Sequence, residues 1–220
     1  MKRAVIFDVD GTLLDTERHY MEGWRQGGIL EGHPVAEEAL HRTRGVNSRE
    51  LAVAIFREHC GADFPYDVIR VHRHRIAEER IAACTPEQLR KPWAMETLAV
   101  LREKGYLLAV ATATGKERTQ IHMAQAGLLD YFQAVITGDM VKNSKPAPDI
   151  FLLAAERLHC SPEECIVVGD SPNDVFAAVA AGMDVYLIPD QVPANPETRA
   201  LSRRVLEDMG QLIPAMEALG

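Results

Sequence analysis

Five short apolar runs recur along this chain, and they constrain its fold more than any other feature. They occupy residues 4–7, 106–111, 134–137, 165–168 and 185–188. None alternates apolar with polar residues, which is typical of strands that are covered on both faces of a sheet. We therefore expect five buried strands, four of them beyond residue 100.

Segments of helical periodicity separate the later apolar runs. They span residues 95–104, 116–126, 149–158 and 171–181. Glycine, which commonly ends a helix, follows three of them at Gly105, Gly127 and Gly182. A capping box with proline at residues 161–164 predicts a further helix start. Strands that alternate with helices in this way predict an α/β fold with a doubly wound parallel sheet.

Residues 15–90 interrupt this alternation. Apolar positions such as Leu51, Ile55 and Val68 recur at helical spacing, and no segment reads as a convincing strand. A capping box at residues 85–88 marks another helix start. We therefore expect a second, smaller all-helical domain at residues 15–90, inserted into a core made of residues 1–14 and 91–220.

Composition excludes several classes of protein. A chain of 220 residues predicts one or two domains, and a net charge of −8 without a basic stripe argues against a nucleic-acid partner. No apolar run approaches the roughly 18 residues of a membrane span, or the about 7–15 residues of a signal peptide core near the N-terminus. The four cysteines form no C-x-x-C pair and no zinc pattern, which favours reduced thiols in a cytoplasmic protein.

Polar residues cluster where the predicted strands end. Asp8 and Asp10 follow the first strand, Thr112 follows the second, and Lys145 lies in the loop after the third. Asp170 and Asp174 follow the fourth strand. Ligands of open parallel sheets bind beyond these carboxyl ends, so we expect the side chains to share one crevice.

Several carboxylates in one crevice repel one another, so either their pKa values rise or a cation lies among them. Oxygen ligands alone favour Mg²⁺ over zinc or copper. A carboxylate cluster with Mg²⁺, one lysine and free backbone amides is suited to a phosphoryl group, whose charge these groups neutralise. An aspartate can attack the phosphorus, and a second aspartate two residues away can transfer protons.

Four segments resemble, in order, the motifs of the haloacid dehalogenase superfamily in its phosphatase form. They read DVDGTLLDT at residues 8–16, ATATGK at 111–116, SKPAPDIF at 144–151 and GDSPND at 169–174. The resemblance implies a Rossmann-like core and a Mg²⁺-dependent phosphatase of small phosphorylated metabolites, such as sugar phosphates. It also implies an aspartyl-phosphate intermediate, and it makes the helical insert a cap that closes over the site and selects the substrate.

The resemblance also implies a role for each matching residue. Asp8 would be the nucleophile and a metal ligand, and Asp10 the general acid and base, with its backbone carbonyl on the metal. Thr112, the amide of Ala113 and Lys145 would hold the phosphoryl group. Asp170 would be the other protein ligand of Mg²⁺. Asp174 would lie next to these ligands and act on the site directly or through a water molecule. Dehalogenases and phosphonate hydrolases lack the second aspartate of the first motif, so the presence of Asp10 disfavours both.

The helical insert offers two candidate substrate contacts. Arg49 lies in a loop, residues 45–50, that resembles the cap loop facing the site in this family. Tyr20 aligns with a histidine that assists proton handling in β-phosphoglucomutases, and His19 precedes it. The basic run at residues 72–75 is interpreted as a solvated helix face, and Trp24 as part of the core of the insert.

Two other functions are alternatives for a chain with these motifs. A phosphosugar mutase of the β-phosphoglucomutase type would use the same aspartyl-phosphate but yield isomers rather than free phosphate. A binding or regulatory protein on a retained fold would lack one of Asp8, Asp10 and Lys145, and all three are present. We expect a monomer or weak dimer, with the apolar C-terminal positions (Leu206, Met209, Leu212, Ile213 and Met216) packed in the core.

Overall fold

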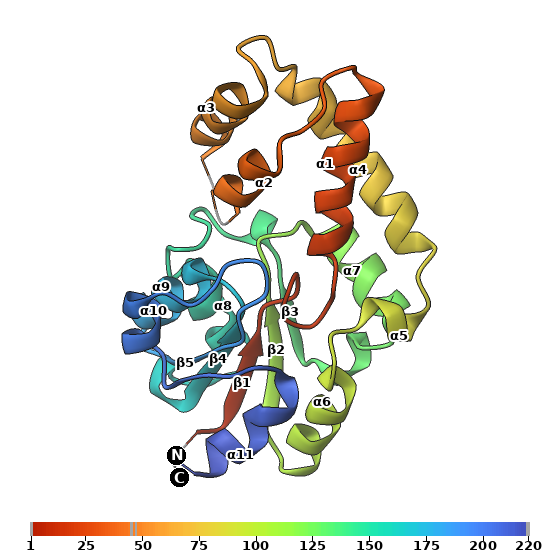
Figure 1. Ribbon diagram of the computed structural model, residues 1–220. Coiled ribbons are helices and arrows are strands. Elements are labelled where there is room, and N and C mark those ends of the chain that lie inside the picture. The colour runs from red at the N-terminus through yellow and green to blue at the C-terminus, as the bar shows by residue number, and fades with distance from the viewer. Residues whose placement is uncertain (1, 45, 47, 219–220) are drawn as a thin grey trace. The chain divides into compact units, whose positions relative to one another are not determined.

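A six-stranded parallel sheet carries the larger part of this chain, as the computed structural model shows for residues 2–44, 46 and 48–218 (Figure 1). The strand order is β3-β2-β1-β4-β5-β6. The strands are β1 (Ala4–Phe7), β2 (Leu107–Ala111), β3 (Ala134–Ile136), β4 (Cys165–Gly169), β5 (Asp184–Leu187) and β6 (Arg204–Val205). The five predicted strands and the parallel sheet are therefore confirmed, and β6 is an additional short edge strand.

The order of the strands reverses at β1. This strand pairs with β2 on one side and with β4 on the other, so that Phe7 lies opposite both Val110 and Val168. From β1 the chain builds outward to β2 and β3, and then returns to add β4, β5 and β6 on the opposite side. The carboxyl ends of β1, β2 and β4 thus meet at the point where parallel sheets bind their ligands.

Helices surround this sheet. They are α5 (Pro86–Leu89), α6 (Ala94–Glu103), α7 (Lys116–Gln125), α8 (Asp149–Arg157), α9 (Pro172–Ala180), α10 (Pro196–Leu201) and α11 (Leu212–Glu217). The main core cluster packs alanine, valine and isoleucine side chains of the sheet against α8 and α9. Of the apolar C-terminal positions, Leu206, Met209 and Leu212 are buried, in line with the core packing expected for that stretch.

One predicted helix start is wrong. The capping box at Ser161 and Glu164 is present, but it caps a single 3₁₀ turn, Pro162–Glu164. Cys165 then enters β4 directly, so the chain has no room to continue a helix. By contrast, the capping box at Thr85 and Gln88 begins the four-residue helix α5.

The chain divides into two compact units, one formed by Met1–Asp15 with Thr85–Gly220 and the other by Thr16–Cys84. The second unit contains α1 (Glu17–Leu30), α2 (Glu37–Thr43), α3 (Arg49–Cys60) and α4 (Tyr66–Ala82), and its described residues form no strand. Helices α1 and α4 lie side by side (Figure 1). Gly23 permits this approach, because a Cβ atom there would lie 2.4 Å from the carbonyl oxygen of Arg73.

An aromatic cluster fills the core of the helical unit. The ring centroid of Trp24 lies 4.4 Å from that of Phe56 and 5.2 Å from that of Tyr66. The ring of Phe64 stacks on that of Phe56, with 5.1 Å between their centroids. Trp24 is buried, as the sequence predicts. Burial of such rings contributes strongly to stability, so this unit has a core of its own.

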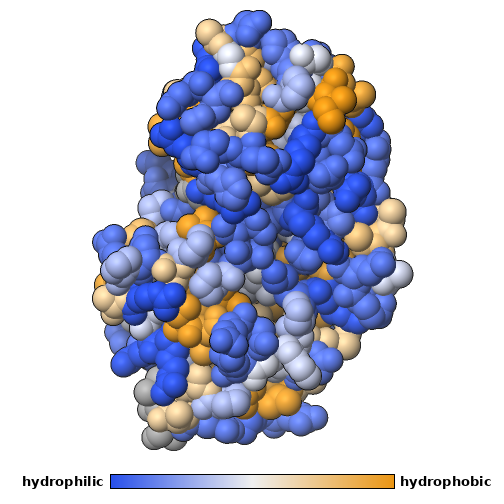
Figure 2. Space-filling model, viewed as in Figure 1, coloured by the Kyte–Doolittle hydropathy of each residue, from blue (hydrophilic) through white to orange (hydrophobic). Residues whose placement is uncertain are grey.

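The described residues contain no helix that is both long enough and apolar enough to cross a bilayer. The face drawn in Figure 2 is mostly hydrophilic, and its apolar side chains form separate small groups.

Candidate active site

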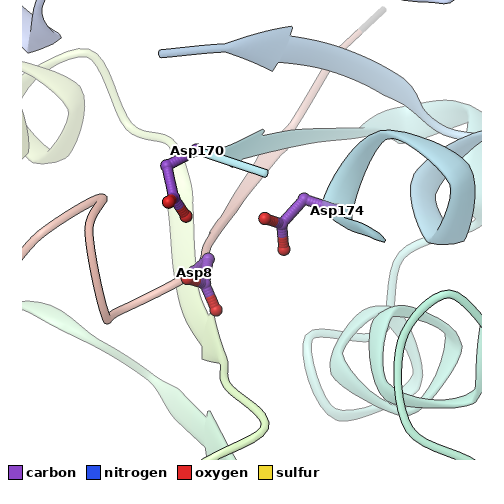
Figure 3. A group of neighbouring side chains, drawn as sticks. All are labelled: Asp8, Asp170 and Asp174. Atoms are coloured by element: carbon purple, nitrogen blue, oxygen red, sulfur yellow. The ribbon is translucent and has the colours of Figure 1, made fainter. Parts of the chain in front are cut away.

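Three carboxyl groups converge at the carboxyl ends of β1 and β4. Asp8 follows β1, Asp170 follows β4, and Asp174 lies in the first turn of α9 (Figure 3). Each offers an oxygen atom, and these atoms lie within 4.8 Å of one another. All three residues are buried, with exposed fractions of 7%, 8% and 1%. The structure thus brings together the carboxylates that the sequence places at neighbouring strand ends.

Lys145 binds two of these carboxylates. Its Nζ atom lies 2.5 Å from Oδ1 of Asp8 and 2.7 Å from Oδ1 of Asp174. The ammonium group also lies 5.1 Å from the ring centroid of Phe151. Burial disfavours its charge, but Asp174 and Asp8 outweigh this effect and raise the pKa of Lys145 above its ordinary value. Lys145 is therefore a permanent cation that links two acids of the site.

Asp8 lies in an environment that disfavours its negative charge. Burial, with a further contribution from the charges of Asp174 and Asp10, raises the pKa of Asp8 to about 7 against the opposing effect of Lys145. One ammonium group thus does not balance the acids around it. A hard divalent cation suits this donor set of carboxylate oxygens and would supply the missing positive charge.

Asp8 and Asp170 are the side chains best placed to bind such a cation. Both oxygens of Asp174 are already used, because Oδ1 accepts from Lys145 and Oδ2 accepts from Ser171 Oγ at 2.6 Å. Asp174 therefore orients Lys145 and caps its own helix. Asp170 also accepts a hydrogen bond from Thr12 Oγ1 at 3.4 Å, which joins the first motif to the fourth.

Two glycines make room for these acids. Gly11 has a φ of +88°, and a Cβ atom there would lie 2.5 Å from Oδ2 of Asp170. A Cβ atom on Gly169 would lie 2.4 Å from the Cβ atom of Asp174. Neither distance is compatible with a larger residue, so the close approach of the acids depends on glycine at both positions.

The end of β2 supplies hydroxyl groups to Asp10. Oδ2 of Asp10 accepts from Thr114 Oγ1 at 2.7 Å and from Thr112 Oγ1 at 3.3 Å. The exposed Ala113 lies between these threonines, and its amide donates to no acceptor within the described part of the chain. This amide is thus available to an anion, as an oxyanion site requires.

The sequence of this chain matches the haloacid dehalogenase-like hydrolase family over residues 2–182. The chain belongs to this family. It is 35% identical over 181 residues to the phosphorylated carbohydrates phosphatase of Thermotoga maritima, covering 82% of each chain. It is 34% identical over 183 residues to the fructose-1-phosphate phosphatase YqaB of Escherichia coli, covering 82% of this chain and 93% of that one.

A solved structure shows the same fold. CbbY from Rhodobacter sphaeroides, crystallised in complex with phosphate, superimposes with a TM-score of 0.79 at 25% identity, covering 99% of this chain and 100% of CbbY. The sequence-based assignment to the haloacid dehalogenase superfamily and to its fold is therefore confirmed. The roles that the resemblance gives to single residues stay predictions.

The helical unit of this hydrolase places Tyr20 in a polar cluster. Its hydroxyl group donates to Oε1 of Glu78 at 2.8 Å, and the guanidinium group of Arg73 lies 4.5 Å from the centroid of its ring. Arg73 also lies 5.5 Å from the ring centroid of Trp24. Burial lowers the pKa of Arg73, and its Nε atom is buried without a hydrogen-bond partner in the described part of the chain.

This arrangement corrects the interpretation of residues 72–75 as a solvated helix face. His72, Arg73 and His74 are half-buried, and Arg75 alone of the four is exposed. His72 bonds to Glu31 at 2.7 Å, whereas Arg75 pairs with Glu79 on its own helix. The reason is the glycine-lined contact of α1 with α4, which brings the first three side chains against α1.

Arg49 begins α3 and is exposed. It forms an ion pair with Asp67 and lines a hollow of the helical unit together with Arg57 and Tyr66. Gly45 and Asn47 of the same predicted loop lie outside the described residues. The substrate contacts expected of Arg49 and Tyr20 stay predictions.

Sequence reasoning assigned no role to two residues, Thr114 and Arg73, that have distinctive surroundings in the structure. Thr114 is two positions after Thr112, as Asp10 is two positions after Asp8, and this matched spacing could have indicated that they meet. Arg73 lies in a basic run that reads as solvated, and the glycines of α1 were the available signal.

Proposed function

We propose that this hydrolase is a Mg²⁺-dependent phosphatase that cleaves a small phosphorylated metabolite, such as a sugar phosphate, through an aspartyl-phosphate. The observation that carries the proposal is the convergence of Asp8, Asp170 and Lys145 beside the Asp10 carboxyl group. The similarity to two phosphatases of phosphorylated carbohydrates and fructose 1-phosphate supports the substrate class.

Asp8 acts as the nucleophile in this proposal. A carboxylate oxygen of Asp8 forms a bond to phosphorus while the ester P–O bond breaks, and Asp10 gives its proton to the leaving alkoxide. Water then attacks phosphorus, Asp10 accepts a proton from it, and the bond between Asp8 and phosphorus breaks. Free phosphate leaves, and both aspartates return to their starting states.

Other groups of the core hold the phosphoryl group. Thr112, the amide of Ala113 and Lys145 donate hydrogen bonds to its oxygens and offset its charge. Asp8, Asp170 and the carbonyl oxygen of Asp10 would hold Mg²⁺, which stabilises the charge that develops on the transferring group. Asp174 keeps Lys145 in place through their 2.7 Å ion pair.

The helical unit acts as the cap that selects the substrate. Arg49 and Tyr20 are the contacts inferred from the sequence. The boundaries at residues 14/15 and 90/91, the cytoplasmic location and the monomeric or weakly dimeric state also stay predictions.

Phosphate release from a panel of phosphorylated metabolites tests this function. We expect Mg²⁺-dependent release by the wild type and loss of release in Asp8→Asn. Retained turnover in that variant overturns the nucleophile assignment.

A phosphosugar mutase is the alternative outcome, recognised by isomeric products and activation by a sugar bisphosphate. The hydroxyl group of Tyr20, which donates to Glu78, replaces the histidine of the mutases and disfavours this alternative. A binding protein on a retained fold would show no turnover. Stabilisation by Mg²⁺ with BeF₃⁻, a phosphoryl mimic, then separates an intact site from a lost one.

A further inference from the structure

We infer that Thr114 is a positioning residue for Asp10, and that its hydroxyl group sets the orientation in which Asp10 gives its proton to the leaving oxygen. The inference rests on the proposed phosphatase function and assigns to Thr114 a part in the proton-transfer step. It follows from contacts made inside the sheet-containing unit.

Two threonine hydroxyl groups of the described chain donate to the same oxygen of Asp10, and the bond from Thr114 is the shorter. Thr114 Oγ1 lies 2.7 Å from Oδ2 of Asp10, which is the usual length for a hydroxyl donor. Thr112 Oγ1 lies 3.3 Å from that oxygen, beyond the usual range of about 2.5–3.0 Å. Thr114 therefore makes the stronger contact with Asp10.

Substrate binding increases the importance of Thr114. The hydroxyl group of Thr112 has one proton, and the proposed function requires it to donate that proton to the phosphoryl group. Thr112 cannot then donate to Asp10 as well. With substrate bound, Thr114 is the threonine that still holds the carboxyl group.

The backbone of Thr114 is fixed on several sides. Its carbonyl oxygen accepts from the amide of Gly138 at 3.2 Å, and its amide donates to Thr112 Oγ1 at 3.1 Å. Gly138 can approach because it has no Cβ atom, which would lie 2.3 Å from the carbonyl oxygen of Ala113. A side chain on so constrained a segment can fix the direction of its partner.

Holding Oδ2 determines which oxygen of Asp10 carries the proton. Oδ2 already accepts the hydroxyl hydrogen of Thr114, which makes it the less favourable oxygen for the carboxyl group's own proton. The acidic proton of Asp10 is therefore directed to Oδ1. Without the hydroxyl group of Thr114, the carboxyl group of Asp10 can rotate. Its proton is then no longer held on Oδ1 and no longer directed at the leaving oxygen. The loss matters most when the leaving group needs a proton, because an alkoxide is a far poorer leaving group than a nitrophenolate.

The test compares two leaving groups in one variant. We expect Thr114→Val to lower kcat for glycerol 2-phosphate by about 100-fold, the lower end of what general acid catalysis contributes. The same variant should keep the first-turnover rate of nitrophenolate release from 4-nitrophenyl phosphate, measured by stopped flow with excess enzyme, within about threefold. Nitrophenolate leaves without a proton, and this first step does not use Asp10 as a base. Thr114→Ser, which keeps the hydroxyl group, should restore turnover of both substrates.

Thr137→Val is the matched control. Thr137 is a buried threonine at the end of β3, and its hydroxyl group donates to Asp139 at 2.5 Å, outside the acidic cluster. We expect this control to leave both activities unchanged. If Thr114→Val does not fold, as judged by its melting curve, Thr114→Ala replaces it with the same expected selectivity.

The outcomes separate this inference from the proposed function. Equal loss of glycerol 2-phosphate turnover and of first-turnover nitrophenolate release in the Thr114 variants, or no loss in either, overturns the role of Thr114. Hydrolysis by the wild type then leaves the phosphatase function standing. Failure of the wild type to release phosphate from these two substrates and from every member of the metabolite panel overturns the proposed function and this inference with it.

Discussion

The ammonium group of Lys145 lies 2.5 Å from Oδ1 of Asp8, and both side chains are almost fully buried. The two residues are 137 positions apart in the chain, so folding of the whole sheet is needed to bring them together. Asp174 shares the same ammonium group. The site therefore contains a buried cation whose removal would leave two acids unpaired.

Replacing Lys145 with methionine should destabilise the protein at neutral pH. Breaking a buried ion pair from one side typically costs about 3–5 kcal/mol, because the remaining charge stays desolvated. We expect a loss of about 3 kcal/mol in the free energy of unfolding, measured by urea denaturation at pH 7.5 in EDTA. The loss should shrink at pH 5, where Asp8 can be protonated at little cost.

Lys91→Met provides the control for this change. Lys91 pairs with Asp190 at 2.9 Å but is more exposed than Lys145, so its loss should cost below about 1 kcal/mol. Equal costs for the two variants would contradict the importance of the buried cation.

Replacing Asp8 with asparagine should stabilise the metal-free protein at high pH. The pKa of Asp8 is raised from 3.8 to about 7, so the folded state binds more protons than the unfolded state between these pH values. Stability from this group is therefore present at low pH and is lost as pH rises toward 7. Since one pKa unit corresponds to about 1.4 kcal/mol, the gain in Asp8→Asn has an upper limit of about 4 kcal/mol.

Urea unfolding of both proteins in EDTA at pH 5, 6.5 and 8 checks this sign. The advantage of Asp8→Asn should grow with pH. A constant difference across this range would mean that Asp8 titrates in its ordinary range.

The sheet and the strand ends could be predicted because their signals are local. An apolar run such as residues 165–168 followed by Gly169 and Asp170 indicates a buried strand that ends in a polar loop. β6 could not be predicted, because Arg204–Val205 is two residues long and owes its place to its pairing with β5.

The sequence did not predict which side chains of the site bond to one another. The bridge of Lys145 to Asp174 does not follow from spacing. The matched spacing of Thr114 and Asp10 indicates only that their strand ends meet, because the hydrogen bond itself depends on side-chain rotation. Trp93 shows a similar limit, because it adopts the left-handed conformation at φ 65°, which residues with a side chain rarely adopt. Its ring packs over Gly210, where an added Cβ atom would lie 3.1 Å away.

Mg²⁺ should raise the melting temperature of the wild type but not of Asp170→Asn. Asp170 belongs to the acidic cluster that we propose binds the ion. A ligand that binds only the folded state adds about 2.7 kcal/mol to the free energy of unfolding when its concentration is one hundred times its dissociation constant. Thermal melts over a Mg²⁺ titration measure the shift. Asp130→Asn, at an exposed aspartate, should keep the full effect. A full shift in Asp170→Asn would remove Asp170 from the proposed metal ligands.

Gly11→Ala should weaken Mg²⁺ binding, and Gly105→Ala should not. Both glycines have positive φ, at +88° and +81°, so alanine at either position is strained by about 1 kcal/mol or more. At Gly105 no atom lies within 4 Å of the added Cβ, whereas at Gly11 it would lie 2.5 Å from Oδ2 of Asp170. The control therefore reports backbone strain alone, and the difference between the variants reports displacement of the Asp170 carboxylate.

We expect both variants to lose a similar amount of stability from strain, with a further loss in Gly11→Ala. The Mg²⁺ concentration for half-maximal phosphate release should rise at least about tenfold in Gly11→Ala, which equals about 1.4 kcal/mol of lost binding. It should stay at the wild-type value in Gly105→Ala. Equal Mg²⁺ requirements in the two variants would show that Asp170 can move away from the added methyl group without cost, and that the close approach of Gly11 does not hold it in place.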